Sequence, residues 1–192
     1  MTEPRPGLPA MVPTDALTGL PAHEALHSEL ERLVRVGEPF SLLRIDLDFF
    51  RLVNGDGLRE RGNQMLRRTA QAVAAASPEG APVFRCGGDE FAVLVATGAA
   101  PEAFEIGERI CAAVAAIEVP ASAEPDRAPP RLACSVGVAR YPADGGTAPR
   151  LWVAAGELLF SAKHFGGGHA AVADTAIMPW LAELLDGLAD EP

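Results

Sequence analysis

A glycine pair between two short apolar runs is the feature that most constrains how this chain can fold. The runs, residues 81–85 and 91–95, have the length of β-strands, and Gly87-Gly88 lies between them. Glycine adopts positive φ without strain, so two adjacent glycines permit a tight chain reversal. The segment is therefore predicted to form a β-hairpin with Asp89 in its turn.

The hairpin lies in the middle of an alternating pattern of strands and helices. Strand-like runs at 40–46 and 132–139 and helical patterns at 65–73 and 104–117 surround it. This β-α-β-β-α-β order is that of the ferredoxin-like split unit. The predicted fold class is α+β: an α/β sandwich with a ferredoxin-like palm, in which helices flank a mainly antiparallel sheet of about five strands.

Further elements lie outside this unit. A helix opened by Pro21 precedes it, and a helix at 151–164, capped by the glycines 166–168, follows with a short strand at 169–172. An apolar stripe at 180–188 indicates a helix that contacts a second copy of the chain or, alternatively, packs on its own core. The predicted boundaries are 1–13 for a flexible segment, 14–174 for one domain and 175–192 for the amphipathic C-terminal helix.

The charge and composition of the 192 residues limit the classes of function. A formal net charge of −10 argues against sequence-blind nucleic-acid binding, which needs a basic surface. No apolar run is long enough to span a membrane. The three cysteines form no CxxC pair, so they indicate neither a disulfide framework nor a zinc site. We expect a cytoplasmic protein that binds neither nucleic acid nor membrane.

Two acids that are distant in the sequence are predicted to converge. The first strand of the split unit lies antiparallel to the third, so Asp46 at the end of the first meets Asp89 at the start of the third. With Glu90 beside them, these like charges are costly unless they hold a cation or share protons. Carboxylates of this number suit Mg²⁺, which completes its shell with water and phosphates. The alternative, from composition alone, is a solvated hairpin tip.

Five short segments carry a family resemblance. They read DALTGL at 15–20, DLDFFRLVN at 46–54, GGDEF at 87–91, SVGVA at 135–139 and LLFSAK at 158–163. In this order they are similar to the motifs of the GGDEF family of diguanylate cyclase-like nucleotidyl cyclases.

The resemblance implies a diguanylate cyclase that condenses two GTP into cyclic di-GMP and releases pyrophosphate. Each 3′-hydroxyl would attack the α-phosphate of the other GTP across a homodimer, with two Mg²⁺ or Mn²⁺ ions per active site. A regulatory protein partner is a further expectation. By position in the motifs, the catalytic residues are Asp46, Asp89 and Glu90, the metal ligands are these three and the Leu47 carbonyl, and the substrate contacts are Asn54, Asn63, Arg51, Gly87, Gly88 and Lys163.

Several side chains near the motif acids have structural interpretations. We expect Phe49, Phe50 and Phe91 to pack in the core, and Asp15 to be a turn residue rather than a catalyst. The alternative for Lys163 is a solvated lysine at a helix end.

Among the positions that depart from the family pattern, three are predicted to affect substrate contacts. Arg51 stands where the family has Lys, Gly167 stands where a phosphate-contacting Arg is expected, and Asn63 stands where an Asp contacts guanine. An amide offers one acceptor and one donor and can pair with adenine, so ATP use and a mixed or adenine-containing product are open alternatives. A further alternative is a nucleotide-binding regulatory domain whose catalysis has faded.

Overall fold

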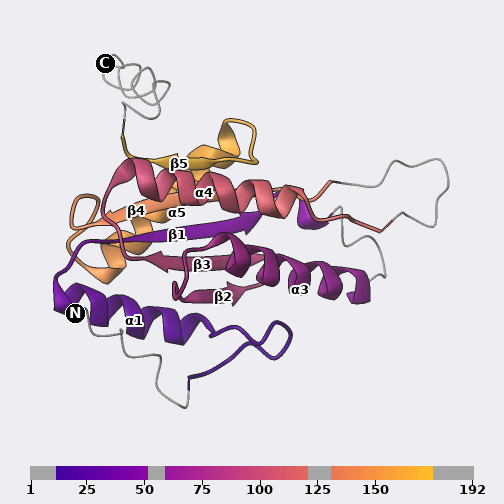
Figure 1. The fold of residues 1–192 in the computed structure, drawn as a ribbon, viewed down its shortest axis with the longest axis horizontal. Helices are drawn as coiled ribbons and strands as arrows, with labels where there is room; N and C mark the ends of the chain where they lie inside the picture. The colour runs from indigo at the N-terminus through magenta and orange to yellow at the C-terminus, as the bar shows by residue number, and fades with distance from the viewer. Residues whose placement is uncertain (1–11, 52–58, 121–130, 175–192) are drawn as a thin grey trace, which may run out of the picture.

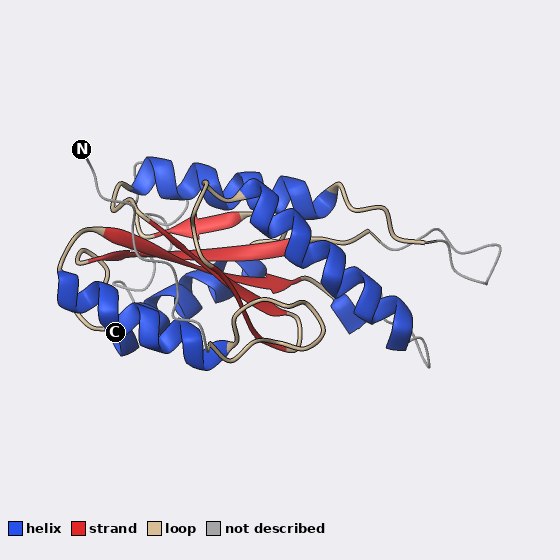
Figure 2. Cartoon of the chain, turned by 60° about the horizontal axis from the view of Figure 1, so that its bottom comes forward, coloured by secondary structure: helices blue, strands red, loops and turns tan. Residues whose placement is uncertain are grey.

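A five-stranded sheet with helices on both faces is the centre of the computed structural model, which describes residues 12–51, 59–120 and 131–174 (Figures 1 and 2). The strands are β1 (Phe40–Leu47), β2 (Val83–Gly87), β3 (Glu90–Val95), β4 (Cys134–Tyr141) and β5 (Ala170–Val172). The helices are α1 (His23–Val36), α3 (Arg59–Ala76), α4 (Ala100–Ala115) and α5 (Ala148–His164).

The topology confirms the predicted ferredoxin-like arrangement and the α+β class. The strand order is β2-β3-β1-β4-β5. The central strand β1 runs antiparallel to β3 and to β4, and β2 pairs antiparallel with β3. The short strand β5 adds to the edge in parallel with β4, so the sheet is mixed.

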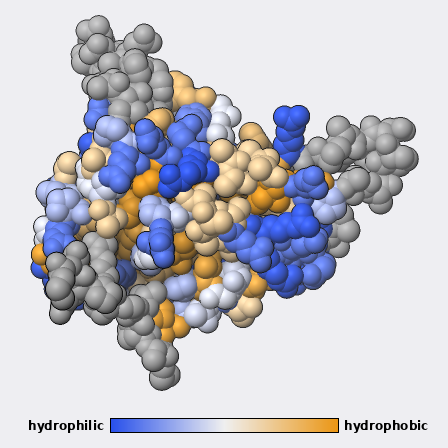
Figure 3. All heavy atoms as spheres, viewed as in Figure 1, coloured by the Kyte–Doolittle hydropathy of each residue, from blue (hydrophilic) through white to orange (hydrophobic). Residues whose placement is uncertain are grey.

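The hydrophobic core lies on both faces of β1. Because side chains alternate along a strand, Leu43 and Ile45 pack with α3 and α4, whereas Leu42 packs with α1 and α5. Helix α3 is amphipathic: Met65 and Val73 are fully buried, and hydrophilic residues gather over the helix in the view of Figure 3. The sheet therefore separates two layers of helices.

Helix α5 begins earlier than the sequence pattern predicted. It starts at Ala148 rather than at Leu151, because the Thr147 hydroxyl accepts a hydrogen bond from the Arg150 backbone N–H and Pro149 occupies the first turn. The sequence Thr147-Ala148-Pro149 is thus the start signal of this helix.

The glycines after α5 cap it as predicted. The Gly166 N–H donates to the Lys163 carbonyl and the Gly167 N–H to the Ala162 carbonyl, which is the pattern of a Schellman motif. Both glycines have positive φ, 110° and 70°.

The predicted helix at 175–192 and most of the predicted segment 1–13 lie outside the described residues, so the domain boundaries stay predictions. Within the described part of the chain, no helix combines the length and apolar character needed to cross a bilayer. The three cysteines are free.

Helix α5 lies directly on β4 at Gly137. A Cβ at this position would be 2.0 Å from the Ala155 carbonyl oxygen and 2.4 Å from the Leu159 nitrogen, both of them backbone atoms of α5. Only a glycine allows this approach, which accounts for the glycine of the 135–139 motif.

We predict that Gly137→Ala lowers the free energy of unfolding by about 1–3 kcal/mol, because the helix backbone must move away from the sheet. Urea denaturation measures this. Gly146→Ala is the matched control: nothing lies within 4 Å of a Cβ there, so its effect should stay within about 0.5 kcal/mol. Equal losses in the two variants would contradict the close approach of α5.

Candidate functional site

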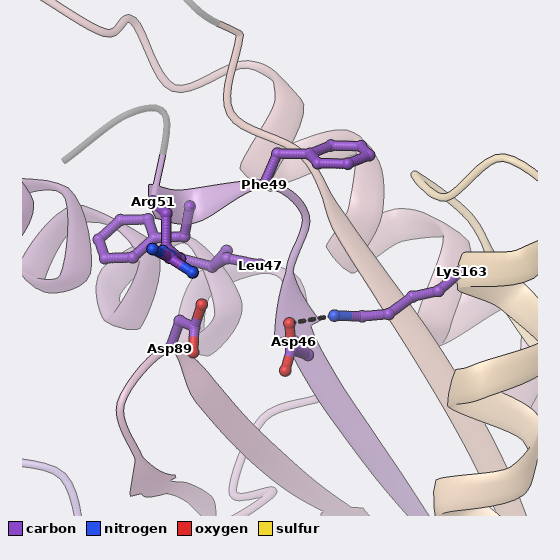
Figure 4. A pocket seen from close by; sticks show the side chains of 7 residues that line it. Asp46, Leu47, Phe49, Arg51, Asp89 and Lys163 are labelled. Atoms are coloured by element: carbon purple, nitrogen blue, oxygen red, sulfur yellow. Dashed lines mark hydrogen bonds and ion pairs between the residues drawn. The ribbon is translucent and has the colours of Figure 1, made fainter. Parts of the chain in front are cut away.

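An open pocket of about 700 Å³ lies at the edge of the sheet where β1 ends and β3 begins (Figure 4). Asp46 pairs with Glu90 across the two strands, and the Leu47 N–H approaches the Asp89 carbonyl oxygen at 3.4 Å. The predicted convergence of Asp46 and Asp89 is therefore confirmed. The pocket is lined by Asp46, Leu47, Phe49, Phe50, Arg51, Asp89 and Lys163.

Lys163 reaches into the pocket from the last turn of α5. Its Nζ forms an ion pair with Asp46 Oδ1, and the Asp46 side chain is only 17% exposed (Figure 4). Burial raises the pKa of Asp46, and the charges of Asp89 and Glu90 raise it further, whereas Lys163 lowers it without cancelling these effects. Lys163 is therefore paired with the acid cluster while its side chain stays exposed to solvent, and a cation at Asp46 would be favoured.

Glu90 faces Arg44 rather than the pocket. Arg44 Nη2 lies 3.6 Å from Glu90 Oε2, and the Arg44 guanidinium lies 3.7 Å from the centroid of the Trp152 ring. A guanidinium over an indole face gains a cation–π interaction. Of the three predicted acids, Asp46 and Asp89 line the pocket, whereas Glu90 forms an ion pair with Arg44 of β1.

The glycine turn at 87–88 is stabilised by hydrogen bonds of Arg85. Gly87 and Gly88 have φ of 133° and 53°, which side-chain-bearing residues rarely adopt. One Arg85 amino group donates to the Gly88 carbonyl at 2.6 Å, and the other donates to Asp15 Oδ1 at 2.8 Å. The turn is thus fixed in the conformation that exposes its backbone.

Asp15 is a turn residue, as predicted. Its Oδ1 accepts hydrogen bonds from the backbone N–H and the hydroxyl of Thr18. Burial tends to raise the pKa of Asp15, but the hydrogen bonds from Thr18 and Arg85 outweigh burial and the pKa is lowered. The opening turn therefore acts through Arg85 on the glycine turn.

The core prediction was wrong for Phe49. Phe50 and Phe91 are buried at 8% and 1% exposure, but Phe49 is 78% exposed. The reason is the backbone: Phe49 has φ of 51°, a left-handed turn that directs its side chain outward at the pocket wall. Strand alternation does not extend past the end of β1.

The other predicted substrate contacts differ in their position relative to the pocket. Arg51 lines the pocket. Asn63 lies half-buried in the second turn of α3 and is not among the pocket-lining residues. Asn54 lies outside the described residues.

Asp48 is a positioning residue that the sequence analysis did not single out. It is buried, accepts hydrogen bonds from the Ser135 hydroxyl at 2.9 Å and from the Gly168 N–H at 2.8 Å, and so ties the end of β1 to β4 and to the turn after α5. A Cβ at Gly167 would lie 2.9 Å from Asp48 Oδ2. The available signal was the second acid of the 46–54 motif.

The donor set fits a hard divalent cation. Two carboxylates face the pocket, which is what Mg²⁺ usually takes from a protein before water and phosphate oxygens complete its shell. Among residues 12–51, 59–120 and 131–174, no group of three or more His, Cys, Asp or Glu could hold a metal. The described residues thus fit an open site shared with a phosphate ligand, not one closed by protein groups alone.

Comparison with known proteins identifies the family of the chain. The family described as "Diguanylate cyclase, GGDEF domain" matches residues 12–169. Response regulator PleD of Caulobacter vibrioides is 32% identical over 157 residues, which are 80% of this chain and 34% of PleD.

Two solved structures resemble the fold. The GGDEF domain of PA1120 (TpbB or YfiN) from Pseudomonas aeruginosa has a TM-score of 0.74 and 28% identity, covering 88% of this chain and 99% of that one. Diguanylate cyclase SiaD from Pseudomonas aeruginosa, solved in complex with its activator SiaC, has a TM-score of 0.72 and 28% identity, covering 83% and 61%.

The chain belongs to the diguanylate cyclase GGDEF family, a family of nucleotidyltransferases. It spans about a fifth to a third of the length of the curated relatives it matches.

We predict that Lys163→Met raises the pKa of Asp46 and that Asp89→Asn lowers it. The first change removes a cation that lowers this pKa, and the second removes an anion that raises it. Titration of the Asp46 carboxyl carbon by NMR measures both shifts. Arg150→Met, which removes an exposed charge in the first turn of α5 at the opposite end of the helix from Lys163, is the control and should leave the pKa of Asp46 in place. A lowered pKa in Lys163→Met would contradict the described ion pair.

Proposed function

We propose that this chain is a diguanylate cyclase domain that condenses two GTP into cyclic di-GMP. In each half-reaction a 3′-hydroxyl oxygen forms a bond to an α-phosphorus, the bond from that phosphorus to the β-phosphate bridging oxygen breaks, and pyrophosphate leaves. The observation that carries the proposal is the meeting of Asp46 and Asp89 in one pocket with Lys163 (Figure 4). Acids from two strands and a lysine from a helix suit a metal-bound triphosphate.

Two Mg²⁺ or Mn²⁺ ions would be held by the carboxylates of Asp46, Asp89 and Glu90 and by the Leu47 carbonyl. Such ions neutralise charge on an attacking hydroxyl and on a departing pyrophosphate. Glu90 would turn from Arg44 to ligate a cation or to accept the proton of the 3′-hydroxyl. The buried, repelled charge of Asp46 favours taking up a cation at this place.

The phosphates would lie against the glycine turn. Gly87 and Gly88 offer a backbone without Cβ, whose positive φ is already set by the Arg85 hydrogen bond. Lys163 would leave Asp46 for the terminal phosphates once a metal ion takes its place, and the exposed Arg51 supplies a second cation at the pocket. Asn54 and Asn63 would read the base.

The reaction needs two GTP that face each other, so we propose that two copies of the chain form the active dimer. We also propose a regulatory protein partner, supported by the complex of SiaD with its activator.

A nucleotide-binding regulatory domain with faded catalysis is the second candidate. The turn at Gly167 favours it: with φ of 70° and the Asp48 carboxylate 2.9 Å from a Cβ, the place of the family's arginine is filled by a hydrogen-bonded glycine turn. One phosphate contact is then lost. The pair Asp46 and Asp89 favours catalysis, because a binder that only holds nucleotide has little use for both acids.

We predict that the purified chain with Mg²⁺ or Mn²⁺ and GTP makes a cyclic dinucleotide and that Asp89→Ala abolishes it. Mass spectrometry of incubations with GTP, ATP or both, at high protein concentration, identifies the product and its bases. Glu79→Ala, which removes an exposed acid from the 78–81 turn, is the control and should leave the product unchanged. Triphosphate binding without product under every condition would leave the regulatory domain as the function.

We predict that Asn63→Asp raises the preference for GTP over ATP. A carboxylate accepts both guanine donors, and a matched polar pair is worth about 1–3 kcal/mol, or about 5- to 150-fold in the ratio of binding constants. Non-hydrolysable GTP and ATP analogues measure that ratio independently of turnover. Gln64→Glu places the same charge change on the exposed side of α3 as control. An equal change in both variants would refute the role of Asn63.

A further inference from the structure

Two histidines on α1 face each other outside the acid pocket. His23 and His27 are one helical turn apart, and their Nε2 atoms lie 3.0 Å from each other. Their ring centroids are 4.5 Å apart and the rings are nearly perpendicular, at 77°. At this distance the Nε2–H of one ring donates a hydrogen bond to the Nε2 of the other, so one proton lies between the two imidazole nitrogens.

The pair packs against Trp152 of α5. The Trp152 ring lies 5.4 Å from His23 and 5.7 Å from His27, between ring centroids. On Trp152 also lies Arg44, the partner of Glu90. The histidines therefore occupy the contact between α1 and α5 and share Trp152 with Arg44.

The histidine pair does not satisfy its own polar groups. His23 Nδ1 is buried with no hydrogen-bond partner. Nδ1 lies on the opposite side of the ring from Nε2, so this unpartnered atom does not face the point where the two Nε2 atoms converge. The feature that concerns a ligand is the convergence of the two Nε2 atoms at 3.0 Å.

We propose that His23 and His27 form a chelating site for a borderline divalent cation of the Zn²⁺, Ni²⁺ or Cu²⁺ class. Two imidazole nitrogens at about 2.0–2.1 Å from one metal are about 2.9 Å apart at a right angle and about 3.4 Å apart at the tetrahedral angle. The observed 3.0 Å lies in this interval. The cation replaces the shared proton, and both rings bind it as neutral ligands.

This site is chemically distinct from the carboxylate pocket. Imidazole suits Zn²⁺, Ni²⁺ and Cu²⁺, whereas the oxygen ligands of Asp46 and Asp89 suit Mg²⁺. Water supplies the remaining ligands, since no third His, Cys, Asp or Glu completes a metal group in the described part of the chain. The net charge of −10 attracts cations to the protein as a whole. A bound ion would clamp the first turns of α1 against Trp152.

Trp152 provides the readout. In the full chain carrying Trp180→Phe, the only remaining tryptophan is Trp152, and Ni²⁺ or Cu²⁺ should quench its emission in the presence of excess Mg²⁺, which occupies the carboxylates. His27→Gln should weaken metal binding by at least about tenfold. Loss of a residue that only hydrogen-bonds to a metal ligand already lowers metal affinity by about that factor, and His27 is a ligand itself. Two control variants should bind Ni²⁺ or Cu²⁺ as the parent does. Asp89→Asn changes the acid pocket, and His164→Gln removes an exposed histidine at the end of α5.

NMR of the four imidazoles in the unsubstituted chain gives an independent test that needs no variant to fold. Zn²⁺ should shift the ring nitrogens of His23 and His27 and leave those of His164 and His169 in place. Equal affinity in His27→Gln, loss of binding in Asp89→Asn, or Zn²⁺ shifts confined to His164 or His169 would each overturn the site.

Discussion

The antiparallel pairing of β1 with β3 determines where every acid of the site lies. Side chains alternate along a strand, so a slip of one residue would turn Asp46 to the opposite face of the sheet. The acids themselves oppose the arrangement, since Asp89 and Glu90 raise the pKa of Asp46. Large buried side chains on both faces of β1, such as Leu42 and Leu43, oppose any slip. The hydrophobic core thus forces together carboxylates that repel each other, and this stored repulsion favours a bound cation.

Helix α5 adds the cationic part of the site. Its backbone rests on β4 at Gly137, which brings Lys163 to Asp46 at one end of the helix and Trp152 over Arg44 near the other. Behind the helix, Asp48 binds the Gly168 N–H and fixes the turn that follows Lys163. The ion pair of Lys163 with Asp46 therefore depends on packing away from the pocket, and the close approach at Gly137 sets the position of the lysine.

Much of the fold and of the acid cluster could be predicted from sequence. Strand and helix periodicity and the glycine pair established the split unit, and its topology alone placed Asp46 beside Asp89. Features that depend on local backbone or on distant partners could not be read in this way. Phe49 has positive φ without being glycine, so the expectation that this large apolar side chain packs in the core was wrong. The pairing of Glu90 with Arg44 and of Asp48 with Ser135 joins residues far apart in sequence through side-chain geometry that no periodicity encodes.

The most direct measurement is a crystal structure of the chain with Mn²⁺ and a non-hydrolysable GTP analogue, with the metal located by anomalous scattering. The account predicts Mn²⁺ bound by both Asp46 and Asp89, phosphates along Gly87 and Gly88, and Lys163 turned from Asp46 to the triphosphate. A nucleotide bound away from the glycine turn, or Mn²⁺ that contacts neither aspartate, would contradict it.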